Sequence, residues 1–249
     1  MNEAEYKHFY DRVGKINGWN FSHVGCVSEG VKWDFYQEVS ANCKQSDLLL
    51  DIGTGGAEAL LSMTDAALFV VGIDQSMGMV EAANANLQKS GKSNIRVLHM
   101  DAEEINFPDG FFNVVSCRHS PFFVNEVVRV LANDGIFLTQ QVSEGDKFNL
   151  KQAFGRGQSF GIQDGTSKHQ YMSQLRIAGF KEVQSFEYDA TEYYKSYEDV
   201  IFLLKHTPII PNFGANDTDF AVLEKCIELN QTDKGIMTNS KRYMIIAKK

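Results

Sequence analysis

Five short apolar segments recur between residues 47 and 142, and stretches with helical periodicity separate them. Each segment is apolar almost throughout, whereas a strand with one face in water would alternate apolar and polar residues. Continuous apolar runs are typical of strands covered on both faces of a sheet. The expected strands are 47–52, 68–73, 95–100, 112–117 and 136–142.

Two of the intervening stretches carry signals for the start or end of a helix. Residues 75–90 place apolar side chains near a 3.6-residue period, with Ser76 as a plausible N-cap and Gly91 as a plausible stop. Residues 122–131 form a second expected helix, which ends at the turn-forming 133–135. The alternation of strand and helix predicts an α/β fold with a doubly wound, mostly parallel sheet and right-handed crossovers.

The flanks of this core have weaker patterns. Residues 1–46 are rich in aromatics and are expected to be mostly helical. Residues 143–165 are polar and contain glycines, and no element is assigned to them. We therefore predict one domain over residues 1–249. It would comprise an N-terminal helical cap (1–46), a core (47–142) and C-terminal strands (143–249) that hold a second cap insertion (191–240). The later expected elements are helices at 167–178, 197–205 and 217–230 and strands at 180–188 and 242–248.

Composition narrows the function classes. The chain has 249 residues, a formal net charge of −8 and 43% hydrophobic residues, which is typical of a globular protein and argues against disorder. The longest basic block is Lys248-Lys249, so broad nucleic-acid binding is disfavoured. The four cysteines form no CxxC pair, so a zinc ribbon is not expected, and they fit the reduced thiols of a cytoplasmic protein. We find no signal-peptide pattern and no apolar run long enough for a membrane span.

The most informative segment is the glycine-rich loop after the first strand, LLLDIGTGGAEAL at residues 48–60. Glycines allow a sharp turn and a close approach of the backbone to a ligand, and a following helix N-terminus would favour an anionic or strongly polar group. A dinucleotide fingerprint needs a third glycine where Glu58 stands, and that carboxylate would repel a pyrophosphate. A phosphate-binding P-loop would need a Gly-Lys-Ser/Thr ending, which is missing.

Three aspartates stand at the ends of successive strands, where open α/β sheets bind their ligands. Asp51 precedes the glycines and suits a cationic amine. Asp74 closes the second strand, where a carboxylate can accept both hydroxyls of a ribose. Asp101 follows the third strand and could accept from an adenine amino group. Helix capping is the alternative role for Asp74 and Asp101.

These motifs together resemble the class I S-adenosylmethionine-dependent methyltransferases, most closely the small-molecule branch that includes ubiquinone- and menaquinone-type enzymes. The resemblance covers about residues 47–142, and the usual third glycine of the loop is replaced by Ala57. It implies a Rossmann-like sheet of seven strands with an antiparallel last strand. The residues that carry it are Asp51-Ile-Gly53-Thr-Gly55-Gly56, Asp74, Asp101-Ala102-Glu103 followed by Phe107-Pro108-Asp109, and Arg129-Val-Leu before Gly135.

The resemblance also implies S-adenosylmethionine as cofactor, S-adenosylhomocysteine as product and no metal. Gly53 and Gly55, with Thr54 between them, would face the methionine part, with Asp51 near its amine. Asp74 would hold the ribose. The remaining expected contacts are Gln75 and Met79 flanking the adenine, Asp101 and Ala102 meeting its amino edge, and Cys117 and Arg118 beside the methyl donor.

On the acceptor side, His119 is the candidate general base, because an imidazole titrates near neutrality. The alternative is a hydrogen-bonded loop histidine. Tyr10 and Trp33 are candidates for a lid over the sulfonium through cation–π contact, and ordinary packing is the alternative.

We expect methylation of a small molecule. The open alternatives are an RNA methyltransferase of the ribosomal guanine type and a non-catalytic S-adenosylmethionine-binding protein. A nicotinamide oxidoreductase is disfavoured by Glu58. The sequence leaves the acceptor and the oligomeric state open.

Overall fold

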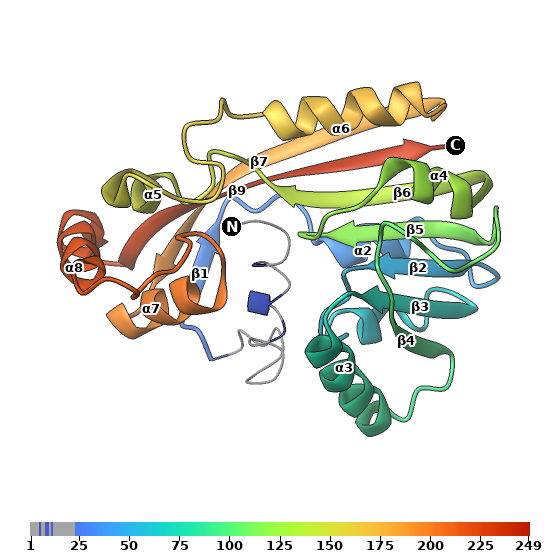
Figure 1. Ribbon diagram of the computed structural model, residues 1–249, viewed down its shortest axis with the longest axis horizontal. Helices are drawn as coiled ribbons and strands as arrows, with labels where there is room; N and C mark the ends of the chain where they lie inside the picture. The colour runs from blue at the N-terminus through green and yellow to red at the C-terminus, as the bar shows by residue number, and fades with distance from the viewer. Residues whose placement is uncertain (1–4, 6–7, 10, 12–22) are drawn as a thin grey trace.

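A mixed β-sheet runs through the whole of the computed structural model, which describes residues 5, 8, 9, 11 and 23–249 (Figure 1). Within these residues the sheet has nine strands in the order β1-β7-β9-β6-β5-β2-β3-β4, with β8 pairing beside β9. The strands are β1 (Cys26–Glu29), β2 (Leu48–Ile52), β3 (Phe69–Asp74), β4 (Ile95–His99), β5 (Phe112–Arg118), β6 (Leu131–Val142), β7 (Glu182–Tyr194), β8 (Gln231–Thr232) and β9 (Gly235–Lys248).

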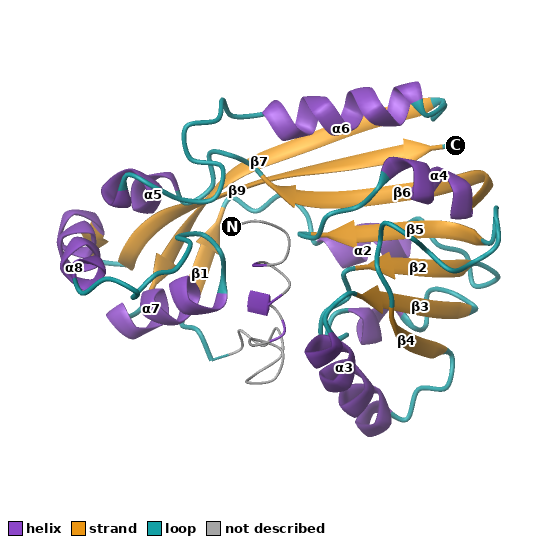
Figure 2. Ribbon diagram, viewed as in Figure 1, coloured by secondary structure: helices purple, strands orange, loops and turns teal. Residues whose placement is uncertain are grey.

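Helices cover both faces of the sheet (Figure 2). Helices α4 and α6 pack on one face through Val127 and Leu175, and α2 and α3 pack on the other through Val39 and Ala83. The helices are α2 (Phe35–Ala41), the 3₁₀-helix η1 (Leu60–Met63), α3 (Met77–Ser90), α4 (Val124–Val130), α5 (Phe148–Phe154), α6 (Thr166–Ile177), α7 (Tyr197–His206) and α8 (Thr218–Asn230).

The predicted α/β architecture is confirmed. Strands β4, β3, β2, β5 and β6 are parallel, and β9 lies antiparallel between β6 and β7. Ser76 caps α3 by accepting a hydrogen bond from the Met79 N–H at 3.2 Å, and Gly91 ends that helix with a φ of 67°. The seven-stranded core therefore forms as expected, with β1 and β8 added to it.

The expectation of a mostly helical segment 1–46 is wrong at Cys26–Glu29, which form strand β1. This strand pairs antiparallel with residues 191–194 of β7. A partner so distant in the chain leaves no periodic signal in four residues, so the local pattern could not reveal the pairing.

The end of the chain also departs from the expected elements. Strand β7 continues to Tyr194, and β9 already begins at Gly235. Residues 143–165, to which the sequence assigned no element, contain helix α5. Around the far ends of β7 and β9 lie α5, α7 and α8, which build a third apolar cluster that includes Leu150 and Leu223 (Figure 1). Helix α5 is short, so its stability comes from this packing rather than from its own sequence.

No helix in the described part of the chain is long and apolar enough to cross a membrane.

Candidate functional site

The carboxyl ends of the parallel strands lie along one edge of the sheet, as the arrowheads of β2, β3, β5 and β6 show in Figure 2. Asp51 lies near the end of β2, Asp74 ends β3 and Arg118 ends β5. The sequence-predicted cofactor residues of the core are thus brought to one edge by the parallel topology. Tyr10, one of the two lid candidates, lies outside the described residues.

The glycine-rich loop turns sharply after β2. Gly53 and Gly55 have φ values of 72° and 58°, in the left-handed region that favours glycine. The Gly55 N–H donates to Asp74 Oδ2 at 2.9 Å, and Asn86 on α3 donates from Nδ2 to the Gly56 carbonyl at 2.9 Å. Asn86 was not among the predicted site residues, because only the packing of α3 on the sheet brings it to the loop.

The expectation of an α-helix directly after the glycines is wrong. The chain instead forms the four-residue 3₁₀-helix η1, after a turn in which Ala57 has a φ of 62°. A helix so short has little macrodipole, so the attraction of an anionic group by a helix N-terminus, expected from the sequence, does not apply here.

Ala57 stands where the resembling family has a glycine, and its backbone is strained there. We expect Ala57→Gly to raise the free energy of unfolding by about 0.5–1 kcal/mol, because relief of the left-handed conformation outweighs the entropy cost of glycine. Urea unfolding followed by circular dichroism measures this. Ala59→Gly is the matched control. Ala59 has a φ of −77°, and glycine there should lower the stability by a similar amount. A loss of stability at both positions would contradict the argument that the Ala57 backbone is strained.

Asp74 has the geometry of a positioned acceptor. Its Oδ2 accepts from Gly55 and its Oδ1 accepts from the Ser76 N–H at 2.9 Å, so the carboxylate is held at both oxygens. Burial raises the pKa of Asp74, and these two N–H groups partly oppose that shift. Each carboxylate oxygen has a further lone pair, which leaves room for two ligand hydroxyls.

Asp51 is almost completely buried, at 1% exposure. Its Oδ1 accepts from the Ser116 hydroxyl at 2.6 Å. Burial raises the pKa of Asp51 to about 6, although the hydrogen bond from Ser116 lowers it. The positive charge of Arg118 also lowers it. A ligand amine would lower it further, which fits the predicted amine contact.

The predicted adenine contacts have different surroundings. Asp101 is exposed and its Oδ1 accepts from the Glu103 N–H at 2.9 Å, so it caps a turn, whereas the alternative considered from the sequence was a helix cap. The adjacent Ala102 and Gln75 are half-buried, and the Gln75 carbonyl lies 3.0 Å from His99 Nε2. Met79 is 3% exposed on α3, so it is part of the helix packing.

Cys117 and Arg118 point to opposite faces of the sheet. Cys117 is fully buried in the core shared with α4 and α6, and its thiol donates to the Ser120 carbonyl at 3.2 Å. Arg118 is exposed, with its guanidinium carbon 5.4 Å from the centre of the Tyr36 ring. Of the two, only Arg118 has a side chain that can reach a ligand.

The acceptor-side candidates Trp33 and His119 are linked by a residue the sequence did not reveal. Gln140 on β6 accepts from Trp33 Nε1 at 2.7 Å, and its Nε2 lies 3.1 Å from His119 Nε2. Trp33 also packs edge-to-face on Tyr188, with ring centroids 4.6 Å apart. These residues lie close together because β5 pairs with β6, β6 with β9 and β9 with β7.

The residues at this edge fit S-adenosylmethionine. Thr54 Oγ1 is the buried side-chain polar atom that lacks a hydrogen-bond partner in the described chain, and it lies within the glycine-rich loop. The loop, the held carboxylate of Asp74 and the buried Asp51 offer, in order, close backbone approach, two hydroxyl acceptors and an anion. These groups match the amino acid and ribose parts of that cofactor.

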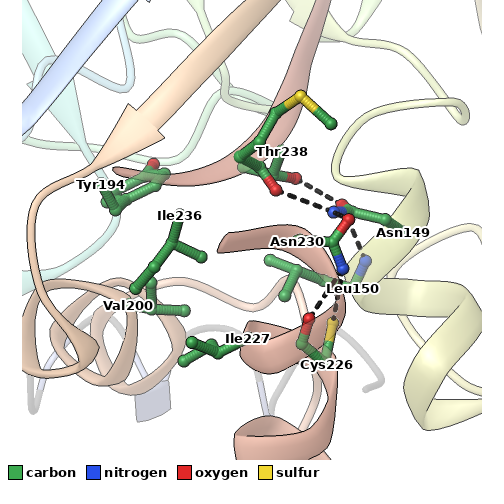
Figure 3. A pocket seen from close by; sticks show the side chains of 10 residues that line it. Asn149, Leu150, Tyr194, Val200, Cys226, Ile227, Asn230, Ile236 and Thr238 are labelled. Atoms are coloured by element: carbon green, nitrogen blue, oxygen red, sulfur yellow. Dashed lines mark hydrogen bonds between the residues drawn. The ribbon is translucent and has the colours of Figure 1, made fainter. Parts of the chain in front are cut away.

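A small cavity between α5, α7, α8 and β9, away from the strand ends, is a packing void rather than a site (Figure 3). Its volume is about 10 Å³, which is room for one water molecule at most. On its rim, Asn149 donates a hydrogen bond to Asn230 and accepts one from the Thr238 hydroxyl. Among the residues that the structure describes, no group of three or more His, Cys, Asp or Glu side chains could hold a metal ion.

Comparison with known proteins locates the similarity in the core. A family model described as "Methyltransferase domain" matches residues 50–139. The chain is 34% identical over 106 residues to the uncharacterized methyltransferase YcgJ of Bacillus subtilis, an alignment that spans 40% of this chain and 42% of YcgJ. It is 26% identical over 166 residues to the demethylmenaquinone methyltransferase of Bacillus velezensis, covering 62% of this chain and 71% of that protein.

Solved structures extend the similarity to the fold. The crystal structure of YcgJ superimposes with a TM-score of 0.60 at 24% identity, covering 86% of this chain and 96% of YcgJ. The [4+2]-cyclase SpnF superimposes with a TM-score of 0.61 at 16% identity, covering 98% of this chain and 95% of SpnF. At these identities the likeness shows the architecture alone.

Proposed function

Residues 50–139 form a class I S-adenosylmethionine-dependent methyltransferase domain, and from that premise we propose that the chain methylates a small molecule with S-adenosylmethionine. The observation that carries the proposal is the pair of N–H groups from Gly55 and Ser76 on the Asp74 carboxylate. They join the glycine-rich loop to the end of β3 and hold an acceptor for ribose hydroxyls in place.

When bound, the cofactor supplies a methyl carbon activated by its positive sulfur. The acceptor would provide the electron pair that takes up this methyl group. The protein's part is to align the two partners and to exclude water, which together can contribute about 7–11 kcal/mol. Asp51, Asp74 and the glycine-rich loop would hold the cofactor, and the end of β5 would face the acceptor.

A small acceptor is favoured over a nucleic acid. The net charge of −8 opposes binding to a phosphate backbone. The relatives support the same choice, because demethylmenaquinone is the acceptor named for one of them. The four cysteines carry free thiols, which fits a cytoplasmic location.

The alternative from another class is a cofactor-binding protein that transfers no methyl group. It remains a candidate because SpnF, named a [4+2]-cyclase, has the same fold. Such a protein would bind S-adenosylmethionine but would form no S-adenosylhomocysteine from it in the presence of acceptors.

Isothermal titration of the purified chain with S-adenosylmethionine, S-adenosylhomocysteine and NADH tests the proposal. We expect micromolar dissociation constants for the two sulfur compounds and no heat with NADH. Absence of binding by a folded protein would refute the proposal, and binding of NADH alone would favour an oxidoreductase.

We further expect the affinity for S-adenosylhomocysteine to depend on pH through Asp51. Because the pKa of Asp51 is raised to about 6, the carboxyl is protonated in the free protein below that pH, and a cationic amine must then displace the proton. The dissociation constant should rise by up to about 10-fold per pH unit below pH 6. Titrations from pH 5 to 8 measure this, and Asp51→Asn should flatten the profile. An equally steep profile in the variant would exclude Asp51 as the cause.

A further inference from the structure

The hydrogen bonds around Gln140 fix which nitrogen of His119 carries the proton. An indole N–H can only donate, so the Gln140 oxygen must be the atom that faces Trp33 at 2.7 Å. The Gln140 amide nitrogen is therefore the atom 3.1 Å from His119 Nε2. That nitrogen donates, so His119 Nε2 must accept, and a neutral imidazole then has its proton on Nδ1.

The Nδ1–H of His119 is free to meet a ligand. It has no hydrogen-bond partner among the described residues. It is also not among the fully buried polar atoms without a partner, so a ligand can approach it. The His119 backbone is fixed as well, with a φ of 56° and an N–H that donates to the Gln140 carbonyl at 2.9 Å. The backbone N–H and the Nε2 atom of His119 are thus both bonded to Gln140, and its Nδ1–H remains as a donor in a fixed position.

The charges around His119 keep it neutral. Burial lowers the pKa of His119 well below its usual value, and Arg242 on β9, Arg118 on β5 and Lys147 before α5 lower it further. Arg242 and Lys147 are paired with Asp146 and Glu192, respectively. Arg118 forms no direct ion pair among the described residues, and its charge acts at longer range on Asp51, whose pKa it lowers. Of the three cations it is the one whose guanidinium is left for a ligand.

We propose that His119 Nδ1–H and the Arg118 guanidinium together bind a negatively charged oxygen of the acceptor, such as a carboxylate or an enolate. Gln140 and Trp33 act as positioning residues. This assigns His119 a donor role in place of the general-base role expected from the sequence, because its Nε2 lone pair is occupied by the Gln140 amide. The binding of an acceptor oxygen rests on the proposed function. The tautomer of His119 does not, because it follows from hydrogen bonds within the protein.

The tautomer can be measured by ¹⁵N NMR of histidine-labelled protein, using two-bond correlations at pH 8. The same spectrum contains references of both kinds. His206 Nδ1 lies 2.8 Å from the Phe202 carbonyl, so it should be the Nδ1–H form, whereas His99 Nε2 lies 3.0 Å from the Gln75 carbonyl, so it should be the Nε2–H form. We expect the Nδ1–H pattern at His119 with no titration between pH 8 and 6. An Nε2–H pattern, or protonation near pH 6.5, would overturn the proposal.

A variant tests the positioning residues. Gln140→Glu replaces the amide donor with a carboxylate, which can accept from both Trp33 and His119. We expect His119 to switch to the Nε2–H form and its pKa to rise, while affinity for S-adenosylhomocysteine changes less than about 3-fold because Gln140 lies outside the proposed cofactor contacts. The matched control, Gln184→Glu on β7, should leave the His119 pattern unchanged. An unchanged pattern in Gln140→Glu would rule out the assigned amide orientation.

The charge preference is tested with benzoate and its uncharged counterpart benzamide, titrated into the complex with S-adenosylhomocysteine. The His119 Nδ1 resonance reports binding. We expect benzoate to bind at least about 10-fold more tightly than benzamide, and Arg118→Gln to abolish the difference. Equal responses to the two probes, or no response to benzoate, would refute the anion site. A failure to bind S-adenosylhomocysteine in the first place would instead refute the proposed function.

Discussion

Replacing Asp74 with asparagine should weaken binding of S-adenosylhomocysteine by at least about 100-fold. The two ribose hydroxyls would each lose a hydrogen bond to a charged acceptor, and such bonds contribute about 1.5–3 kcal/mol each. The variant also replaces one of the two carboxylate oxygens, which accept from the Gly55 and Ser76 N–H groups, with an amide nitrogen that cannot accept. Isothermal titration of Asp74→Asn beside the unaltered protein measures the effect.

Asp101→Asn is the matched control for this substitution. Asp101 is exposed and is bonded to the Glu103 N–H, so its loss should weaken binding by less than about 10-fold. Thermal unfolding of both variants separates a local effect from loss of the fold. Comparable affinities for Asp74→Asn and the unaltered protein would mean that the loop geometry, rather than the carboxylate, selects the ligand.

Replacing Lys147 with methionine should lower the free energy of unfolding by about 3–5 kcal/mol, because it leaves a buried carboxylate without its cation. The Lys147 side chain is 2% exposed, and its Nζ lies 2.7 Å from Glu192 Oε2 and 3.9 Å from Asp146 Oδ1. Arg242 also pairs with Asp146. Urea unfolding measured by circular dichroism gives the change.

The chain offers a matched control and a rescue for this substitution. Lys234 and Glu29 form an exposed pair at the same distance of 2.7 Å, and Lys234→Met should not change the stability measurably. The double variant Lys147→Met/Glu192→Leu should recover much of the loss, since both buried charges are then removed. Loss without recovery in the double variant would show that packing around the Lys147 stem, rather than the charge pair, is what matters.

The same cluster sets the direction of the acid dependence of stability. Burial alone would raise the pKa values of Asp146 and Glu192, but Lys147 and Arg242 bring both below the usual carboxyl range. A lowered folded-state pKa contributes stability that is present above the unfolded-state pKa and is lost as the pH falls through the folded-state value. These two carboxylates therefore favour the folded state at neutral pH and cease to do so in acid.

The parallel core was predictable from the sequence because its signals are local. Strands such as Leu48–Ile52 and Phe69–Asp74 are apolar except for the aspartate at or near the end of each. The caps of α3 at Ser76 and Gly91 are single residues with well-defined conformational preferences. The strand-end aspartates follow from the same pattern. Once the strands are known to be parallel, their carboxyl ends must lie along one edge, and Asp51 and Asp74 come with them.

The edges of the fold were less predictable because their stability comes from distant contacts. Strand β1 depends on β7, and helix α5 depends on packing against α8. The expected helix after the glycines became the 3₁₀-helix η1, since Ala57 adopts a left-handed backbone that ends regular structure there. None of these features has a periodic signal within its own few residues.

The sequence by itself determined the fold class and placed the strand-end aspartates along one edge of the sheet, where we propose that the cofactor binds, because strand pattern and strand ends are properties of local segments. Only the tertiary structure revealed the residues of the proposed acceptor side. Trp33, His119 and Gln140 come from three separated segments, and their roles depend on which atom donates to which. The indole N–H of Trp33 can only donate, so it fixes the orientation of the Gln140 amide and, through that amide, the tautomer of His119. These contacts join segments that are far apart in the sequence, so no local pattern reveals them.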